Sequence, residues 1–261
     1  SMVGREIKGD YYRSDFDGTH GEKVMLHAEH ISNEVLHDVS ITLHEGEILG
    51  LAGLSGCGMH QLGRALFGLD KVKEGRITAV GEGGTEVSIS SVQDALNCRI
   101  GYISKDRDKE ALVLPASIKD NLLIPNLRKM GVLISPRKEK EYAQKQIDFL
   151  AIKCSSMNQA VGELSGGNKQ KVSFGKWIGN NSKIIIMDSP TRGVDIGVKT
   201  TMYQLIARMK KEGYSILIIS EEMPELIGMC DKILVMKDGK VTNAFNRDES
   251  LSEQQIIEYM I

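Results

Sequence analysis

Short, continuous apolar runs separated by helical patterns constrain the fold of this chain most strongly. Four such runs have the length of a strand, at residues 48–52 (ILGLA), 183–187 (KIIIM), 215–219 (SILII) and 232–236 (KILVM). Strands that are apolar on both faces are typical of parallel sheets, in which a helix makes the crossover between strands. Helical patterns at 197–211 and near 223–229 supply such crossovers. The chain is therefore predicted to have an α/β fold with a mainly parallel sheet covered by helices on both faces.

Two parts of the chain depart from this alternation. Residues 24–31 (VMLHAEHI) and 38–43 (DVSITL) alternate apolar and polar side chains, as strands with one solvent-exposed face do. They predict an N-terminal antiparallel β part. At about residues 110–170, helix-forming stretches such as 137–150 (RKEKEYAQKQIDFL) replace the strands. We expect an α-helical subdomain inserted there.

Length, charge and cysteine content exclude several classes of protein. The 261 residues are enough to bury a core without disulfides or a structural metal. With 33 Lys and Arg against 35 Asp and Glu, the net charge of −2 argues against nucleic acid as a partner. No apolar run approaches the roughly 18 residues of a membrane span, and no export leader is visible. Reduced thiols in a cytoplasmic protein are expected, because no C-x-x-C pair links Cys57, Cys98, Cys154 and Cys230.

The first 22 residues have the composition of a linker. Ser1 precedes Met2, as in a tag-cleavage remnant, and residues 10–22 (DYYRSDFDGTHGE) are polar and lack periodicity. We therefore expect residues 1–22 to be a tag remnant and an inter-domain linker, and residues 23–261 to form the domain. An ordinary unstructured N-terminus is the alternative.

A glycine-rich segment follows the first apolar run and precedes a helical pattern. Its residues are Gly53, Leu54, Ser55, Gly56, Cys57, Gly58, Met59 and His60. In the phosphate-binding template G-x-x-x-x-G-K-[ST], the glycines let backbone N–H groups point at an anion at the helix N-terminus. Here Met59 replaces the Lys that reaches the outer phosphates, and His60 replaces the hydroxyl that holds Mg²⁺. By itself the pattern fits a packing role of the glycines equally well.

Two further elements give this segment its context. Asp188 ends the run of residues 184–187, where P-loop NTPases place an Asp that helps to hold Mg²⁺. Before that strand, and just before a helix, lie Leu164, Ser165, Gly166, Gly167, Asn168, Lys169 and Gln170. This L-S-G-G run, in this order between the other two elements, resembles the signature motif of ATP-binding-cassette (ABC) proteins. The likeness covers about residues 23–245.

The resemblance implies a P-loop NTPase core, a nucleotide-binding domain at 23–261, and ATP or ADP with Mg²⁺ as cofactors. In that family two cassettes face each other head to tail, and ATP lies between the phosphate loop of one and the signature of the other. Ser165 and Gly167 would thus serve a nucleotide held by a partner. Asp195 is expected to contact the partner across the interface, with a simple turn residue as the alternative.

More narrowly, the chain looks like the C-terminal cassette of the tandem ATPase of ribose- and galactose-type sugar importers. The segments that carry this likeness are Met2–Glu6, 46–50 (GEILG), 64–68 (RALFG), 164–171, 189–195 (SPTRGVD) and 222–225 (EMPE). The likeness implies an upstream cassette in the same chain, membrane-spanning permease subunits, and indirectly a periplasmic or surface sugar-binding protein. The location implied is peripheral, at the cytoplasmic face of the cell membrane.

The departures from this family fall on catalytic positions. Ser189 follows Asp188 where active cassettes place Glu, which positions or activates the attacking water. Glu221 stands at the position of the switch His, and Lys105 where many cassettes have Gln. No aromatic residue that could stack on adenine occurs around Glu34–Leu36.

Since a positioned base contributes about 10²–10⁴ in rate, we expect this chain's own site to hydrolyse ATP very slowly, if at all. The expected function is that of an importer ATPase subunit whose isolated domain is weak or inactive and whose signature completes the partner's site. The alternatives are a non-hydrolysing regulatory nucleotide-binding module and a cassette protein not linked to transport. No strong metal site is expected, because His27, His30 and His37 fit surface positions.

Overall fold

The computed structural model describes residues 12–126, 135–179 and 182–261. The expected tag remnant and the Met2–Glu6 segment lie outside these residues. The main sheet has the strand order β10-β9-β3-β8-β7-β6. These strands are β3 (Ile48–Gly53), β6 (Ile100–Ile103), β7 (Ile184–Asp188), β8 (Ser215–Ile219), β9 (Lys232–Lys237) and β10 (Lys240–Asn246). Only the β9–β10 pair within this described sheet is antiparallel, so the predicted mainly parallel α/β core is confirmed.

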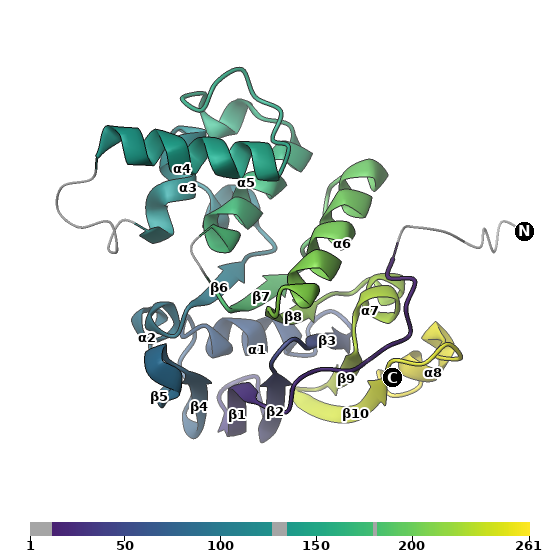
Figure 1. Ribbon diagram of the computed structural model, residues 1–261. Coiled ribbons are helices and arrows are strands. Elements are labelled where there is room, and N and C mark those ends of the chain that lie inside the picture. The colour runs from purple at the N-terminus through teal and green to yellow at the C-terminus, as the bar shows by residue number, and fades with distance from the viewer. Residues whose placement is uncertain (1–11, 127–134, 180–181) are drawn as a thin grey trace, which may run out of the picture.

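The sheet separates two apolar cores, because successive side chains of its central strands point to opposite faces. In β3, Ile48 belongs to one core and Leu49 to the other. The helices α6 (Ile196–Lys211) and α7 (Met223–Met229) cover the first face. The helix α1 (Met59–Leu66) covers the second face, and α2 (Val92–Asn97) packs against β6. A last helix, α8 (Glu253–Ile257), lies near the C-terminus (Figure 1).

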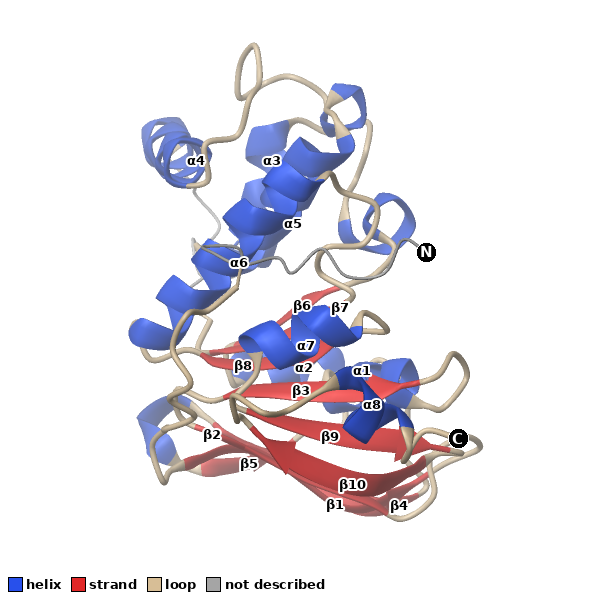
Figure 2. Ribbon diagram, turned by 90° about the vertical axis from the view of Figure 1, so that its right-hand side faces the viewer, coloured by secondary structure: helices blue, strands red, loops and turns tan. Residues whose placement is uncertain are grey.

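The predicted antiparallel part is a second sheet below the first (Figure 2). Its strand order is β2-β1-β4-β5, formed by β1 (Val24–Ser32), β2 (Val39–His44), β4 (Glu74–Val80) and β5 (Glu86–Ser88). All of its strand pairs are antiparallel. Side chains such as Leu26 and Leu43 close the core beneath α1.

Between β6 and β7 the chain forms the helical lobe at the top of Figure 1. It contains α3 (Ile118–Leu123), α4 (Pro136–Phe149) and α5 (Gly166–Ile178), preceded by a π-helical turn at Arg107–Ala111. We expected the helical insertion at about 110–170, and α5 continues to Ile178 because its second half packs on α3 and α4. Short 3₁₀ turns occupy Glu82–Gly84, Ile124–Asn126 and Val161–Glu163. None of the described helices is long and apolar enough to span a membrane.

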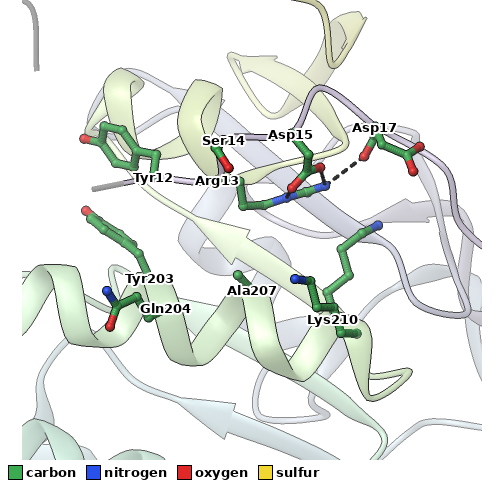
Figure 3. Close-up of a pocket in the computed structure, with 10 residues that line it drawn as sticks. Tyr12, Arg13, Ser14, Asp15, Asp17, Tyr203, Gln204, Ala207 and Lys210 are labelled. Carbon is green, nitrogen blue, oxygen red and sulfur yellow. Dashed lines mark hydrogen bonds and ion pairs between the residues drawn. The ribbon is translucent and has the colours of Figure 1, made fainter. Parts of the chain in front are cut away.

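Residues 12–22, which we call the strap, run along the rest of the domain without helix or strand. Arg13 donates to Asp231 Oδ1 at 2.6 Å and to the Met229 carbonyl at 3.0 Å. A cavity of about 410 Å³ lies between the strap and α6, and the rings of Tyr12 and Tyr203 meet beside it with centroids 5.0 Å apart (Figure 3). Side chains of the domain, such as Asp231 and Tyr203, therefore hold the polar, aperiodic segment of residues 12–22 in place.

Candidate nucleotide site

The glycine-rich segment forms the turn from β3 into α1. Gly56 and Gly58 have φ values of +86° and +100°, in the left-handed region that favours glycine. Gly58 is the N-cap residue of α1, and the preceding Leu54, Ser55 and Gly56 are exposed. The backbone therefore has the shape of a phosphate loop at the start of a helix.

Gly53 is required by packing within this loop. A Cβ atom at Gly53 would lie 2.3 Å from Cys57 Sγ and 2.8 Å from the Met236 carbonyl. The Cys57 side chain folds back beneath the loop, where burial raises the pKa of its thiol. The Cys57 carbonyl in turn accepts a bond of 2.9 Å from Gly239 N, in the turn between β9 and β10.

Met59 supplies packing where the template has a cation. Its side chain is only 1% exposed and joins the apolar core beneath α1. A Lys at this position would instead extend toward the outer phosphates as a charged donor. The loop keeps the backbone shape of the motif without the positive side chain at position 59.

His60 occupies the place of the Mg²⁺-binding hydroxyl and contacts the carboxylate on which that ion depends. Its Nδ1 lies 2.7 Å from Asp188 Oδ1, and its Nε2 lies 3.6 Å from Glu221 Oε1. The Tyr102 hydroxyl donates to Asp188 Oδ2 at 3.2 Å, and the Ser189 hydroxyl lies 3.3 Å from Asp188 Oδ1. Both oxygens of Asp188 are therefore engaged by protein side chains.

Burial raises the pKa of the Tyr102 phenol, and the neighbouring Asp188 carboxylate raises it further. The phenol accordingly stays protonated and remains a donor to Asp188. Mg²⁺ requires oxygen ligands in a near-octahedral arrangement. The imidazole of His60 cannot replace a hydroxyl in that role, and it covers the carboxylate that would be the second ligand. The residues present do not fit the Mg²⁺ site of a working cassette.

The other expected catalytic positions are Ser189, Glu221 and Lys105. Ser189 adopts a φ of 49°, and its N–H donates to the Ile219 carbonyl at 2.8 Å, which fixes the turn after β7. Glu221 has a side chain that is 54% exposed and faces the His60 ring. Lys105 is exposed in the turn that follows β6. Their roles relative to a nucleotide stay predictions.

The signature forms the start of α5. Ser165 is the N-cap residue, and its exposed hydroxyl accepts a bond from Asn168 N. The first N–H groups of a helix have no partner within it, and this applies to those of the partly exposed Gly166 and the buried Gly167. Gln170 is buried and donates to the Pro190 carbonyl at 2.7 Å, which joins the signature to the segment after Asp188.

Several residues of the signature, and Asp195 beside them, have structural roles that the sequence did not indicate. Leu164 is buried, and Asn168 Oδ1 accepts a bond of 2.9 Å from Lys153 N. A Cβ atom at Gly167 would lie 2.6 Å from Val198 Cγ2, in the first turn of α6. Asp195 is the N-cap residue of α6 and accepts a bond of 3.0 Å from Val198 N. A contact of Asp195 with a partner stays a prediction beside this local role.

The link from His60 to Asp188 and Glu221 is the feature that sequence reasoning missed. Each of the three residues was singled out separately, as a departure or as the end of a strand. The available signal was that His60 and Glu221, which carry opposite charges when the ring is protonated, both replace residues of the same catalytic centre.

The comparison with protein families settles the membership. The family model described as ABC transporter matches residues 36–192. The chain belongs to the ABC transporter family. The expected phosphate loop and signature both lie within the matched residues, as does Asp188.

Curated relatives of this cassette carry names of sugar import proteins. A ribose import ATP-binding protein of Lactococcus lactis subsp. lactis (strain IL1403) is 38% identical over 254 residues, which are 97% of this chain and 50% of that protein. An arabinose import ATP-binding protein of Vibrio parahaemolyticus serotype O3:K6 is 39% identical over 253 residues, 95% of this chain and 49% of that protein. The cassette thus spans about half the length of these relatives.

Solved structures support the fold. The dimeric, post-hydrolysis form of the ATP-binding cassette MJ0796, bound to ADP and Pi, has a TM-score of 0.73 at 20% identity and covers 86% of this chain and 99% of that one. The ADP conformation of the cassette MJ1267 has a TM-score of 0.74 at 22% identity, covering 90% and 98%. At these identities the likeness concerns the fold of the cassette.

Proposed function

We propose that this chain is the C-terminal nucleotide-binding domain of an ABC sugar importer ATPase, with a degenerate ATP site of its own and an intact signature. Sugar import is supported by the names of relatives that align over nearly the whole chain. The C-terminal position is supported by the half-length match and by the Met2–Glu6 segment, which resembles the stretch that closes an upstream cassette. The partners proposed are that upstream cassette, the membrane permease and, indirectly, a sugar-binding protein at the cell surface or in the periplasm.

One observation chiefly supports the proposal of a degenerate site. The His60 ring lies against Asp188, 2.7 Å from Oδ1, at the place where a working cassette has a hydroxyl and Mg²⁺. Ser189 and Met59 remove the expected base and cation from the same centre. In contrast, Ser165 caps α5 with its hydroxyl exposed, as an approaching phosphate requires. The chain would thus donate its signature to the ATP bound by the upstream phosphate loop, at the cytoplasmic face of the membrane.

ATP turnover measured on three proteins tests this proposal: the cassette alone, the chain with its upstream half restored, and that longer chain with Ser165→Asp. Asp is also a good N-cap residue, so α5 stays capped while a negative charge meets the phosphate. We expect an inactive cassette, an active longer chain, and turnover at least about 100-fold lower in the variant, as for loss of one preorganised donor. Gly167→Asp is a poorer probe, because its Cβ atom would collide with Val198.

Ser252→Asp in the longer chain is the matched control, since Ser252 is the exposed N-cap residue of α8. It should retain the turnover of the unmodified chain. An isolated cassette that turns over ATP like a working enzyme would contradict the degenerate site. A longer chain that binds ATP without turnover would instead favour a regulatory nucleotide-binding module. This is the second candidate function, and the contact of His60 with Asp188 favours it specifically.

A further inference from the structure

A second cluster of ligating side chains lies away from the nucleotide site, where the strap meets the turn between β2 and β3. His20 of the strap, His44 at the end of β2 and Glu47 at the end of the turn each offer one ligand atom, and these atoms lie within 4.8 Å of one another. The two imidazole rings stack with centroids 4.8 Å apart. The cluster includes none of the histidines that the sequence brought together.

Glu47 needs a cation at this place. Its side chain is 1% exposed, and within the described part of the chain its ion-pair partners are the two histidines. A buried carboxylate without a paired positive charge is costly. Oε2 accepts bonds from His44 N at 2.7 Å and from His44 Nδ1 at 3.0 Å, whereas Oε1 lies 4.0 Å from His20 Nε2.

The hydrogen bond of His20 fixes which of its nitrogens can bind a metal. Nδ1 lies 2.8 Å from the Gly21 carbonyl, which can only accept, so Nδ1 carries the proton. In the neutral ring, Nε2 then presents a lone pair toward Glu47. A backbone carbonyl bonded to the far nitrogen is the usual second partner of a metal-binding histidine.

The backbone holds the strap and the turn together around the cluster. Gly21 N donates to the Glu45 carbonyl at 2.8 Å, and Glu45 N donates to the Lys23 carbonyl at 2.9 Å. From the other side, Lys210 Nζ donates to the carbonyls of Thr19 at 2.9 Å and Gly46 at 3.0 Å. The ligands are therefore positioned before any ion arrives. Tetrahedral zinc needs ligand atoms about 3.3 Å apart, so small side-chain movements suffice.

We propose that His20, His44 and Glu47 bind a divalent transition-metal ion such as Zn²⁺, with water as the fourth ligand, and that the ion clips the strap to the cassette. Two imidazole nitrogens and one carboxylate are a common ligand set for zinc. Binding releases to solvent the proton that His44 Nδ1 shares with Glu47. The site does not rest on the proposed function, although it would fix the segment that leads toward an upstream half.

Isothermal titration of metal-free, tag-free protein with zinc sulfate at pH 7.5 tests the site. All proteins carry Cys154→Ser, because Cys154 is a partly exposed free thiol. We expect saturable binding of one zinc ion per chain and an affinity at least about 100-fold lower in His20→Asn, since even second-shell losses cost 10- to 100-fold. Magnesium chloride should give no comparable heat, because Mg²⁺ prefers oxygen ligands.

His30→Asn is the matched control, because His30 is an exposed histidine of β1 that pairs with Asp38 instead. It should bind zinc like the parent protein. Hydrogen exchange gives a second readout, in which zinc protects the strap amides of the parent and the control but not those of His20→Asn. Equal zinc affinity in His20→Asn and the parent, or binding that does not saturate, would overturn the proposal. His44→Asn is secondary, because it also removes a bond within the turn.

Discussion

At the scale of single residues, the identity of position 60 decides what Asp188 can do. A Ser or Thr is too short to cover the carboxylate and leaves it open to a metal ion. The imidazole spans the gap between Asp188, the last residue of β7, and Glu221, which follows β8. Tyr102 closes the other oxygen of Asp188 from β6. In the proposed degenerate site, a contact within the protein would thus take the place of a bound ion.

Replacing His60 by Thr should reopen this centre. The hydroxyl supplies one Mg²⁺ ligand and the freed Asp188 oxygen another, so Mg²⁺ should strengthen ATP binding by about 10-fold or more, as bonds to charged groups do. Titration with a fluorescent ATP analogue, with and without Mg²⁺, measures this ratio. The unmodified cassette and His60→Ala, which frees Asp188 but adds no hydroxyl, should show ratios near one. A large Mg²⁺ effect in the unmodified cassette would mean that the ring does not block Asp188.

At the scale of elements, close packing of α5 on its neighbours forms the helical lobe. Gly175 lies in the last turn of α5, and a Cβ atom there would lie 2.6 Å from Leu122 Cδ2 and 2.9 Å from Leu150 Cδ1. A glycine in a helix interior costs about 1 kcal/mol relative to Ala. Packing offsets this cost in the helical lobe, because the missing side chain lets α3 and the end of α4 approach α5.

Gly175→Ala should therefore destabilise the cassette although Ala is the better helix former. Overpacking costs about 1–3 kcal/mol, which exceeds the gain in helix propensity. Gly197→Ala is the control, because Gly197 lies in α6 with one neighbour, Asp195 Oδ1, at 3.4 Å from the added atom. The control should be neutral or stabilising. Urea unfolding of both variants measures the two free energies, and a stabilised Gly175→Ala would show that the leucines move aside without cost.

At the scale of the whole molecule, the features predicted from the sequence are those that a local pattern determines. The features missed are those that depend on contacts between distant residues. The bounds of β8 and α7 match the prediction, since a continuous apolar run and an amphipathic turn are local signals. β4 was missed because its first residues, from Glu74 to Arg76, are polar and exposed. The bond from His60 to Asp188 joins residues 128 positions apart, and no local pattern encodes it. Motif positions and the departures at Met59, His60 and Ser189 were accessible from sequence, whereas the contact between His60 and Asp188 was not.

The contacts of the strap also join residues that are far apart in the sequence, since Arg13 and Asp231 are 218 positions apart. Arg13 and Asp231 have side chains that are 3% and 1% exposed, and Asp231 also pairs with Lys210 at 2.6 Å. Arg13→Met should lower the free energy of unfolding by about 2 kcal/mol, because it removes a bond to a buried charged group while Asp231 keeps Lys210 as a partner. Arg76→Met, whose ion pair with Glu29 is exposed, should cost less than about 1 kcal/mol in the same urea titration. Equal losses in the two variants would show that the buried pair of Arg13 and Asp231 adds no more stability than an exposed one.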